Sequence, residues 1–201
     1  MARIELGVTS QTMSGETASA DRHVVRVNGS KVLIAVVDGL GHGAAAVRAA
    51  LTAVRVLEED PVPSPVPLVR RLHEQLRQTR GVVIAVALVD LDACSLEWLG
   101  VGNVAGLLVH NGNHGTPERR KALAQLGGVV GHALPGLWVE ALPIVPGDTL
   151  VFATDGIKAD FDESVATGLP VQRLAQRILS AHRRDNDDAL VVVARILGDA
   201  P

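Results

Sequence analysis

The amino-acid sequence predicts an α+β protein in which antiparallel sheets pack together and helices lie outside them. Two observations support this class. Segments rich in Val, Ile and Leu follow one another as sequential hairpins, and the helical segments are grouped instead of alternating with single strands. The chain has 201 residues, an ordinary length for one domain, so we expect a single domain over residues 1–201.

The clearest secondary-structure signal is a hairpin in the first part of the chain. Residues 22–28 and 31–37 are rich in Val and Ile and are separated by a turn at Asn28-Gly29-Ser30. Two helices are expected next. Residues 43–58 carry apolar side chains at helical spacing up to a proline cluster, and a second helix is predicted over about 67–78.

The remainder of the chain is predicted to contain mostly strands. Residues 81–89 form a nearly continuous apolar run, which is typical of a strand covered on both faces. The stretch 112–136 is rich in Gly, His and Pro and is expected to be a loop. The other predicted elements are strands over 95–101, 104–110, 149–154 and 189–196, an ordered segment over 137–142 and a helix over 171–182.

Composition excludes several classes of function. Hydrophobic residues make up 47% of the chain and charged residues 20%, which is the balance of a globular protein. Aromatic residues are only 2% and the net charge is −3, so neither base stacking nor a basic excess favours nucleic acid as a partner. No apolar run reaches the roughly 20 residues that cross a bilayer, so we expect no membrane partner.

Cysteine content and the N-terminal segment indicate the cellular location of the protein. Cys94 is the one cysteine of the chain, so no internal disulfide can form. The segment from Met1 to Glu5 lacks the apolar region of a secretory signal. We therefore expect a cytoplasmic protein, and the sequence leaves its oligomeric state open.

Acidic residues lie at the ends of predicted strands, and the first two face each other. Asp21 precedes one strand of the hairpin and Asp38 follows the other. A turn centred on Gly29-Ser30 pairs positions whose numbers sum to 59, which places Asp21 opposite Asp38. Like charges at opposed positions destabilise a hairpin unless something neutralises them. A bound cation is the natural candidate to neutralise these two carboxylates.

The same pattern recurs in the second half of the chain. Asp155 follows the strand predicted over 149–154, and Asp187-Asp188 precedes the strand over 189–196. In antiparallel pairs the end of one strand lies beside the start of its neighbour, so these positions can gather at one edge. Clustered carboxylates without Cys or His form a hard oxygen site that suits Mg²⁺ or Mn²⁺. Two such ions about 4 Å apart can hold a bridging hydroxide, which predicts phosphate-ester hydrolysis.

Glycine follows both of the acids that end a strand. In Asp38-Gly39 the exposed backbone allows the Gly39 carbonyl to bind a metal, and no side chain blocks an approaching phosphate. Asp155-Gly156 repeats the arrangement. Taken singly, an Asp-Gly pair after a strand is usually only a turn, and an acidic pair before a strand is usually a solvated loop. Their occurrence together, in this order, favours the functional interpretation.

Four segments carry a family resemblance: Asp38-Gly39-Leu40-Gly41-His42-Gly43, Gly100-Val101-Gly102-Asn103-Val104, Ala153-Thr154-Asp155-Gly156-Ile157 and Asp187-Asp188-Ala189-Leu190-Val191-Val192-Val193. They closely resemble the ordered motifs of the bacterial PPM (protein phosphatase 2C-like) serine phosphatases. Residues 15–21 and 79–81 resemble elements of the RsbX-like, SpoIIE-type branch, which dephosphorylates stressosome proteins. The resemblance covers essentially the whole chain.

This resemblance implies an αββα sandwich with two Mn²⁺ or Mg²⁺ ions on one edge. Asp38 would bridge both ions, while Asp21 and the Gly39 carbonyl would complete the first. Asp155 and Asp187 would hold the second ion. Asp38 and Asp155 would thereby activate the water that attacks phosphorus.

The resemblance also identifies departures from the family pattern. Asp187 is preferred to Asp188 as the ligand because it stands three residues before Leu190, where the family usually has Thr. Leu190 is therefore one departure, and Ala20 in place of the usual Gly before the first Asp is the other. Neither departure removes a predicted ligand.

Other polar residues are weaker candidates. His42 lies beside the predicted metals and is a candidate to protonate the leaving alkoxide, although a backbone-satisfied histidine at a helix start is an equal alternative. Arg80 can contact phosphate or serve as an ordinary surface arginine, and Asn103 is expected to shape a turn. Arg119-Arg120-Lys121 is usually a solvated patch but can dock an acidic partner.

The leading functional prediction is a metal-dependent phosphoserine/phosphothreonine protein phosphatase. The resemblance implies that its substrate is a phosphorylated STAS-domain protein of a stressosome or anti-sigma pathway. A second hypothesis keeps the metals but assigns a small phosphate ester as substrate. A third is a pseudophosphatase that binds phosphoproteins without cleaving them, which loss of a core acid would have favoured.

Overall fold

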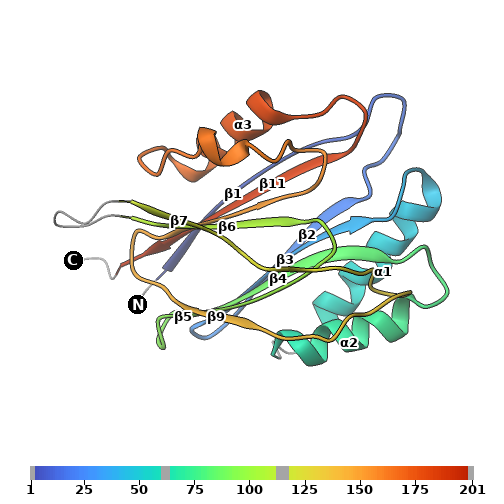
Figure 1. The fold of residues 1–201 in the computed structure, drawn as a ribbon, viewed down its shortest axis with the longest axis horizontal. Coiled ribbons are helices and arrows are strands. Elements are labelled where there is room, and N and C mark those ends of the chain that lie inside the picture. Colours follow the sequence, from blue (N-terminus) through green and yellow to red (C-terminus); the bar gives the residue numbers. More distant parts are fainter. Residues whose placement is uncertain (1–2, 60–63, 112–117, 199–201) are drawn as a thin grey trace.

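The computed structural model describes residues 3–59, 64–111 and 118–198, which form an αββα sandwich (Figure 1). Sheet I contains, in spatial order, β1 (Arg3–Gln11), β11 (Ala189–Leu197), β10 (Thr149–Ala153), β6 (Ala105–His110) and β7 (Arg119–Ala122). Sheet II contains β2 (Asp21–Asn28), β3 (Lys31–Gly39), β4 (Val82–Asp90), β5 (Ser95–Val101) and β8 (Gln125–Leu126), and β9 (Glu140–Pro143) also pairs with β5. The predicted α+β class of two antiparallel sheets flanked by helices is confirmed.

Helices cover the outer faces of both sheets (Figure 1). α1 (Ala44–Glu59) and α2 (Pro65–Leu76) pack on sheet II, while α3 (Val171–His182) and the short 3₁₀ helix η1 (Phe161–Ser164) pack on sheet I. α1 turns an alanine-rich face toward the sheet, because its buried positions are Ala46, Ala49, Ala50, Ala53, Val56 and Leu57. These small side chains allow the helix to lie close to the strands beneath it.

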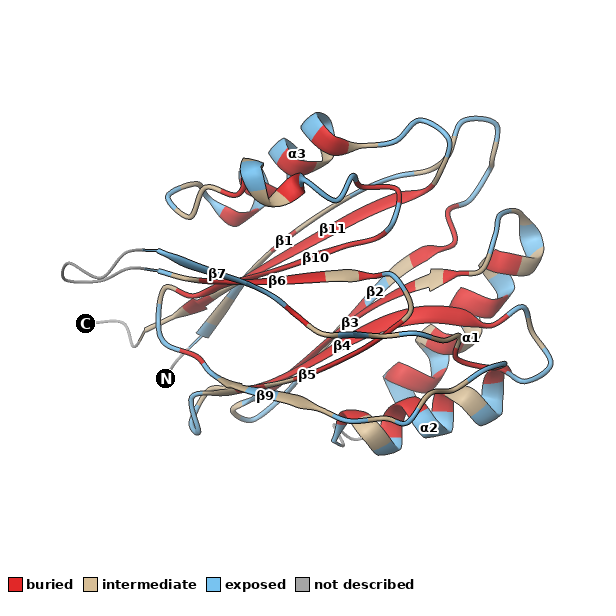
Figure 2. Cartoon of the chain, in the orientation of Figure 1, coloured by how far each residue is buried: buried red, intermediate tan, exposed pale blue. Residues whose placement is uncertain are grey.

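Strand β4 shows why a continuous apolar run is needed at the centre of a sandwich. Ile84 and Val86 belong to the core under the helices, whereas Val83 and Ala85 belong to the core between the sheets. Figure 2 shows this strand buried along nearly its whole length. The expectation that both faces of residues 81–89 are covered is therefore confirmed.

The predicted hairpin register is confirmed residue by residue. β2 and β3 pair with Asp21 opposite Asp38 and Asn28 opposite Lys31, so paired numbers sum to 59 along the ladder. Gly29 in the turn has a φ of +61°, a conformation that glycine adopts without a steric penalty. The three predicted helices are also present, and α3 has the predicted bounds.

Two expectations about regular structure were incomplete. Strand β1 is absent from the sequence prediction, although Ile4, Leu6 and Val8 alternate with more polar residues as in a half-buried strand. The loop predicted over 112–136 was wrong in part, since β7 and β8 lie within it. β7 is an edge strand whose residues are all exposed, so it has no apolar alternation to detect. Residues 112–117 lie outside the described part of the chain.

None of the helices in the described segments combines the length and the apolar character that crossing a membrane requires.

Candidate metal centre

Four strand ends meet at one edge of the sandwich. In sheet II, β2 begins and β3 ends at this edge, and in sheet I, β10 ends and β11 begins there. The loop from β1 to β2 lies beside the loop from α3 to β11 at the same edge (Figure 1). We use the name acid cluster for the residues that these strand ends carry: Asp21, Asp38, Asp155, Asp187 and Asp188.

Asp21 is the most enclosed of the predicted metal ligands. Its side chain is almost inaccessible, with only 5% of the residue exposed. Thr154 Oγ1 donates a hydrogen bond of 2.7 Å to Asp21 Oδ2, and the same hydroxyl accepts one of 2.9 Å from the Leu190 amide. Burial raises the pKa of Asp21 to about 7, against the opposing effect of the Thr154 hydrogen bond, and the charges of Asp188 and Asp155 raise it further.

Asp38 lies opposite Asp21 and has no compensating partner. Within residues 3–59, 64–111 and 118–198, its carboxylate accepts no hydrogen bond and pairs with no cation. Burial raises its pKa to about 9, and repulsion from Asp21 and the other members of the acid cluster adds to this effect. A partly buried carboxylate in this position is stable as an anion only when an external positive charge is supplied.

A cavity of about 120 Å³ opens at the acid cluster. Its lining residues are Asp38, Leu40, Gly41, Val83, Asn103, Asp155 and Asp187. Asn103 Nδ2 donates a hydrogen bond of 2.7 Å to Asp155 Oδ2, which fixes one side of that carboxylate. Burial and then the charge of Asp155 raise the pKa of Asp187, while His42 lowers it. Three carboxylates therefore border one small polar space.

The two neighbouring aspartates before β11 have different roles. The Asp188 carboxylate accepts hydrogen bonds from the amides of Met13 (2.8 Å) and Ala20 (2.6 Å), and the residue is buried. Asp188 therefore ties the β1–β2 loop to the start of β11. Asp187 borders the cavity instead. This division supports the preference for Asp187 as the ligand, which stays a prediction.

Glycines allow the backbone segments of the acid cluster to approach each other closely. A Cβ atom on Gly156 would lie 1.8 Å from the Asp188 carbonyl oxygen, so any side chain there would separate Asp155 from the start of β11. A Cβ atom on Gly39 would lie 2.4 Å from the Ala46 carbonyl oxygen of α1. The expectation that Gly39 keeps space for phosphate is therefore incomplete, because its missing side chain also makes room for α1.

His42 and Arg80 lie next to Gly41, one of the residues that line the cavity. His42 Nδ1 is 3.0 Å from Glu16 Oε1, and the His42 side chain is 72% exposed. This contact differs from the backbone-satisfied alternative considered for His42. A Cβ atom on Gly41, a residue of the cavity wall, would lie 3.0 Å from Arg80 Nη1. The Arg80 guanidinium thus lies against the Gly41 part of the cavity wall.

The donor set fits a hard divalent cation. Asp38, Asp155 and Asp187 present carboxylates to the cavity, and neither Cys nor His is among its lining residues. No group of three or more Asp, Glu, His or Cys side chains in the described ranges is arranged to hold an ion by itself. Unneutralised carboxylates repel one another, and Mg²⁺ usually keeps several waters beside one or two carboxylates, so fewer protein ligands per ion are sufficient.

The two family departures fit the structure without disturbing the acid cluster. Ala20 is buried, and its carbonyl oxygen accepts a hydrogen bond from the Gly39 amide. Leu190 places its side chain in the core between the sheets. Sequence analysis missed the contributions of Thr154 and Asn103, which orient Asp21 and Asp155. Both residues belong to recognised motifs, but their acidic partners lie 52 and 133 residues away along the chain, so only the fold shows these contacts.

Comparison with known proteins supports the relation that these motifs suggest. The family model described as Stage II sporulation protein E (SpoIIE) matches residues 28–197. No curated protein sequence matches the chain. One solved structure, reported for the bacterial stressosome as a modular system adapted to control secondary messenger signalling, is 27% identical with a TM-score of 0.85. That match covers 96% of this chain and 100% of the other.

Two further solved structures share the fold at lower identity. RsbX in complex with magnesium is 16% identical with a TM-score of 0.84, and the match covers 98% of this chain and 100% of RsbX. The PP2C phosphatase domain of SpoIIE from Bacillus subtilis, solved with a regulatory fragment, is 21% identical with a TM-score of 0.77. That match covers 100% of this chain and 65% of the other. The chain therefore belongs to the SpoIIE family and shares the fold of the SpoIIE PP2C phosphatase domain.

Proposed function

We propose that this protein hydrolyses phosphoserine or phosphothreonine in a protein substrate, using two Mn²⁺ or Mg²⁺ ions held at the acid cluster. Asp38 would bridge the ions, Asp21 and the Gly39 carbonyl would complete the first, and Asp155 and Asp187 would hold the second. The observation that carries the proposal is Asp38, a partly buried carboxylate that borders the cavity, has no described partner and is repelled by every neighbouring acid.

Side chains of the chain itself would position the reacting groups. When bound, divalent ions supply a water with a lowered pKa and stabilise the charge that develops on the phosphoryl oxygens. Thr154 and Asn103 hold the carboxylates of Asp21 and Asp155 by their hydrogen bonds. The contact with Glu16 engages His42 Nδ1 as the donor, so Nε2 would give a proton to the leaving alkoxide only from the doubly protonated ring.

The dimensions of the cavity favour a side chain over a small metabolite. Pockets that enclose a drug-sized or cofactor ligand usually have volumes of about 300–1,000 Å³. The cavity at the acid cluster measures about 120 Å³, which is enough for a phosphoryl group and ordered water. A phosphorylated side chain presented by a folded surface meets this requirement. The alternative of a small-molecule phosphate ester would leave most of that molecule outside the cavity.

A phosphorylated STAS-domain regulatory protein in the cytoplasm is the finer substrate proposal. Two observations support it: the similar structures include RsbX and a protein reported for the bacterial stressosome. A pseudophosphatase that only binds phosphoproteins remains an alternative function, but the chain keeps each of the acids predicted to bind metal. The proposed partner is thus a protein that presents one phosphorylated hydroxyl side chain.

Steady-state kinetics can test this proposal. The purified protein should hydrolyse para-nitrophenyl phosphate with Mn²⁺ or Mg²⁺ and lose this activity after complete chelation. A folded phospho-STAS protein should be cleaved with a far higher kcat/KM than free phosphoserine or a nucleotide, because remote docking lowers the barrier. Activity without metal would contradict the metal role. Equal efficiency on phosphoserine, or faster cleavage of a nucleotide, would favour the small-molecule alternative.

A further inference from the structure

A row of side chains on α1 faces solvent on the side of the helix that does not pack on sheet II. Arg48, Leu51, Thr52 and Arg55 recur at spacings of three and four residues, and together they line one shallow surface hollow. Arg48 and Arg55 are exposed, and Leu51 between them is 50% exposed. The alanine-rich face of α1 lies elsewhere on the helix.

This row is continuous with the cavity at the acid cluster. Arg48 also lines a second hollow, together with Ala45 and the segment from Gln78 to Arg80. Arg80 in turn lies directly against Gly41, which belongs to the wall of the cavity. The surface therefore runs from the acid cluster past Arg80 to Arg48 and on to Arg55. We call these residues, with Leu51, the arginine groove.

The positive charges of the arginine groove are not neutralised by the surrounding protein. In the described segments, the guanidinium groups of Arg48, Arg55 and Arg80 have no hydrogen-bond or ion-pair partner. Glu16, which borders Arg48 on a third hollow, pairs with His42. The groove is thus a cationic strip beside a strongly acidic cavity, on a chain whose net charge is −3.

We propose that the arginine groove binds acidic residues that flank the phosphorylated serine or threonine of the protein substrate. The inference rests on the proposed phosphatase function, because it places the phosphoryl group in the adjoining cavity. Arginine pairs with carboxylates through two parallel hydrogen bonds, which suits recognition of Asp or Glu. Leu51 offers an apolar contact between the two arginines of α1. The groove also offsets the repulsion that an acidic substrate meets at the acid cluster.

Phosphopeptides of equal length provide the test. The peptides carry one phosphoserine flanked by Glu, by Gln or by Lys, and each kcat/KM is divided by that for para-nitrophenyl phosphate. Exposed charge pairs contribute modestly, so we expect the Glu peptide to exceed the Lys peptide by about tenfold. The double variant Arg48→Glu and Arg55→Glu should remove or invert this preference. Raising the salt concentration should reduce the preference in the unchanged protein.

Matched arginines on α3 serve as the control. Arg173→Glu and Arg177→Glu change two exposed arginines on the opposite face of the sandwich and should leave the preference unchanged. The milder variants Arg48→Gln and Arg55→Gln should weaken the preference without inverting it. A Glu preference that survives in the double variant, or is absent from the unchanged protein, would overturn the proposal.

Peptide binding separates this proposal from the catalytic one. Fluorescence anisotropy with a labelled Glu-flanked peptide measures binding to the arginine groove even without turnover. The double variant should bind this peptide about tenfold more weakly. Absent metal-dependent hydrolysis together with intact, groove-dependent binding would contradict only the proposed function. Metal-dependent hydrolysis whose peptide preference does not change in the double variant would contradict only the docking proposal. A change in sedimentation without a change in peptide preference would show that the groove contacts a second copy, which also overturns it.

Discussion

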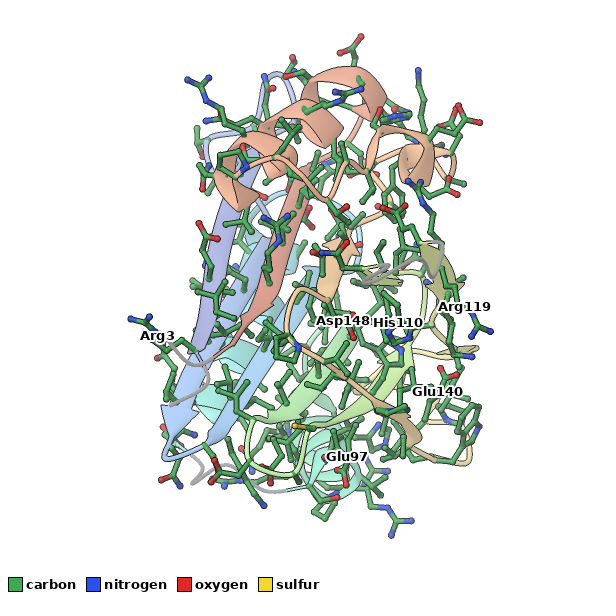
Figure 3. All side chains as sticks on the ribbon, turned by 90° about the vertical axis from the view of Figure 1, so that its left-hand side faces the viewer. Arg3, Glu97, His110, Arg119, Glu140 and Asp148 are labelled. Carbon is green, nitrogen blue, oxygen red and sulfur yellow. The ribbon has the colours of Figure 1, made fainter. Side chains whose placement is uncertain are left out.

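Strand β10 has an aspartate beyond each of its ends, and the two have opposite surroundings. Asp148, before the strand, has no exposed surface. Its carboxylate accepts hydrogen bonds from the amides of Val145 (2.9 Å) and Asn111 (3.2 Å) and lies 2.9 Å from His110 Nδ1. Figure 3 shows the His110 and Asp148 side chains directed toward each other. The protein itself satisfies this buried acid.

In the acid cluster beyond the other end of β10, the carboxylates that border the cavity have far less compensation. Asp155 receives one hydrogen bond from Asn103, while Asp38 receives none from the described residues. Its neighbours are further acids, which raise its pKa. One fold therefore contains a buried acid that stabilises it and, at the cavity, acids that repel one another. The difference distinguishes structural carboxylates from those kept for function.

Replacing Asp38 should separate catalysis from stability. Asp38→Asn removes the proposed bridging ligand, and we expect metal-dependent turnover to fall by at least about 100-fold. The same change removes repulsion within the acid cluster, so the ion-free variant should melt at a higher temperature than the parent. Kinetics at saturating Mn²⁺ and calorimetry of the ion-free proteins measure the two effects. Near-normal turnover of the variant would show that Asp38 does not bridge the ions.

Replacing Asp148 should have the reverse effect. Asp148→Ala leaves the Val145 and Asn111 amides without their acceptor, and we expect a loss of unfolding free energy of about 3 kcal/mol. Turnover per folded molecule should not change, because Asp148 lies at the opposite end of β10. Urea unfolding measures the loss. Asp148→Asn keeps one acceptor oxygen and should lose less stability, so equal losses in both variants would contradict the hydrogen-bond explanation.

Asp187 and Asp188, which precede β11, should show the same division between function and stability. Asp187→Ala should weaken Mn²⁺ binding by about tenfold or more while leaving stability nearly unchanged. Asp188→Ala should reduce stability by about 2 kcal/mol, because it removes the acceptor for the Met13 and Ala20 amides. Mn²⁺ titration and thermal unfolding of both variants distinguish these outcomes. Equal Mn²⁺ affinity in the two variants would leave no reason to prefer Asp187 as a ligand.

Stability of the ion-free protein should depend on pH in the direction set by the acid cluster. Folding raises the pKa values of Asp21 to about 7 and of Asp38 to about 9 from an ordinary value of 3.8. The folded state therefore binds protons more tightly, so stability present near pH 4 is lost as the pH rises toward 9. We expect saturating Mn²⁺ to reverse this loss.

Urea unfolding at several pH values, with chelator and with Mn²⁺, provides this measurement. The Asp38→Asn variant is the matched control and should show a smaller decline with pH. A rise in the stability of the ion-free parent between pH 5 and 8 would contradict the assigned direction of the pKa shifts.

The sequence was most informative where local periodicity and strand pairing agree. The register of the first hairpin followed from one turn, and this register placed Asp21 opposite Asp38. Residues 81–89 were identified as a doubly covered strand because their apolar run is uninterrupted. In each of these cases short-range physics determines the structure, so a single sequence contains the necessary signal.

Features that depend on contacts between distant parts of the chain could not be predicted from the sequence. β7 is a strand only because it pairs with the edge of β6, and its own residues are exposed and polar. Thr154 and Asn103 orient carboxylates that lie 133 and 52 residues away along the chain. The separate tasks of Asp187 and Asp188 likewise depend on the loop that contains Met13 and Ala20. Only the folded arrangement shows these relations.

The pairing of β1 with β11 has a consequence for the synthesis of the protein on the ribosome. β2 and β3 form a local hairpin, as do β4 and β5, and these strands of sheet II can pair once α1 and α2 between the two hairpins have emerged. β1, in contrast, remains without its partner until residues 189–197 have been made. Sheet I is then completed late, and the halves of the acid cluster on the two sheets meet only at that stage. Assembly of the acid cluster is thus among the last events of folding, and a growing chain does not yet carry the complete cluster.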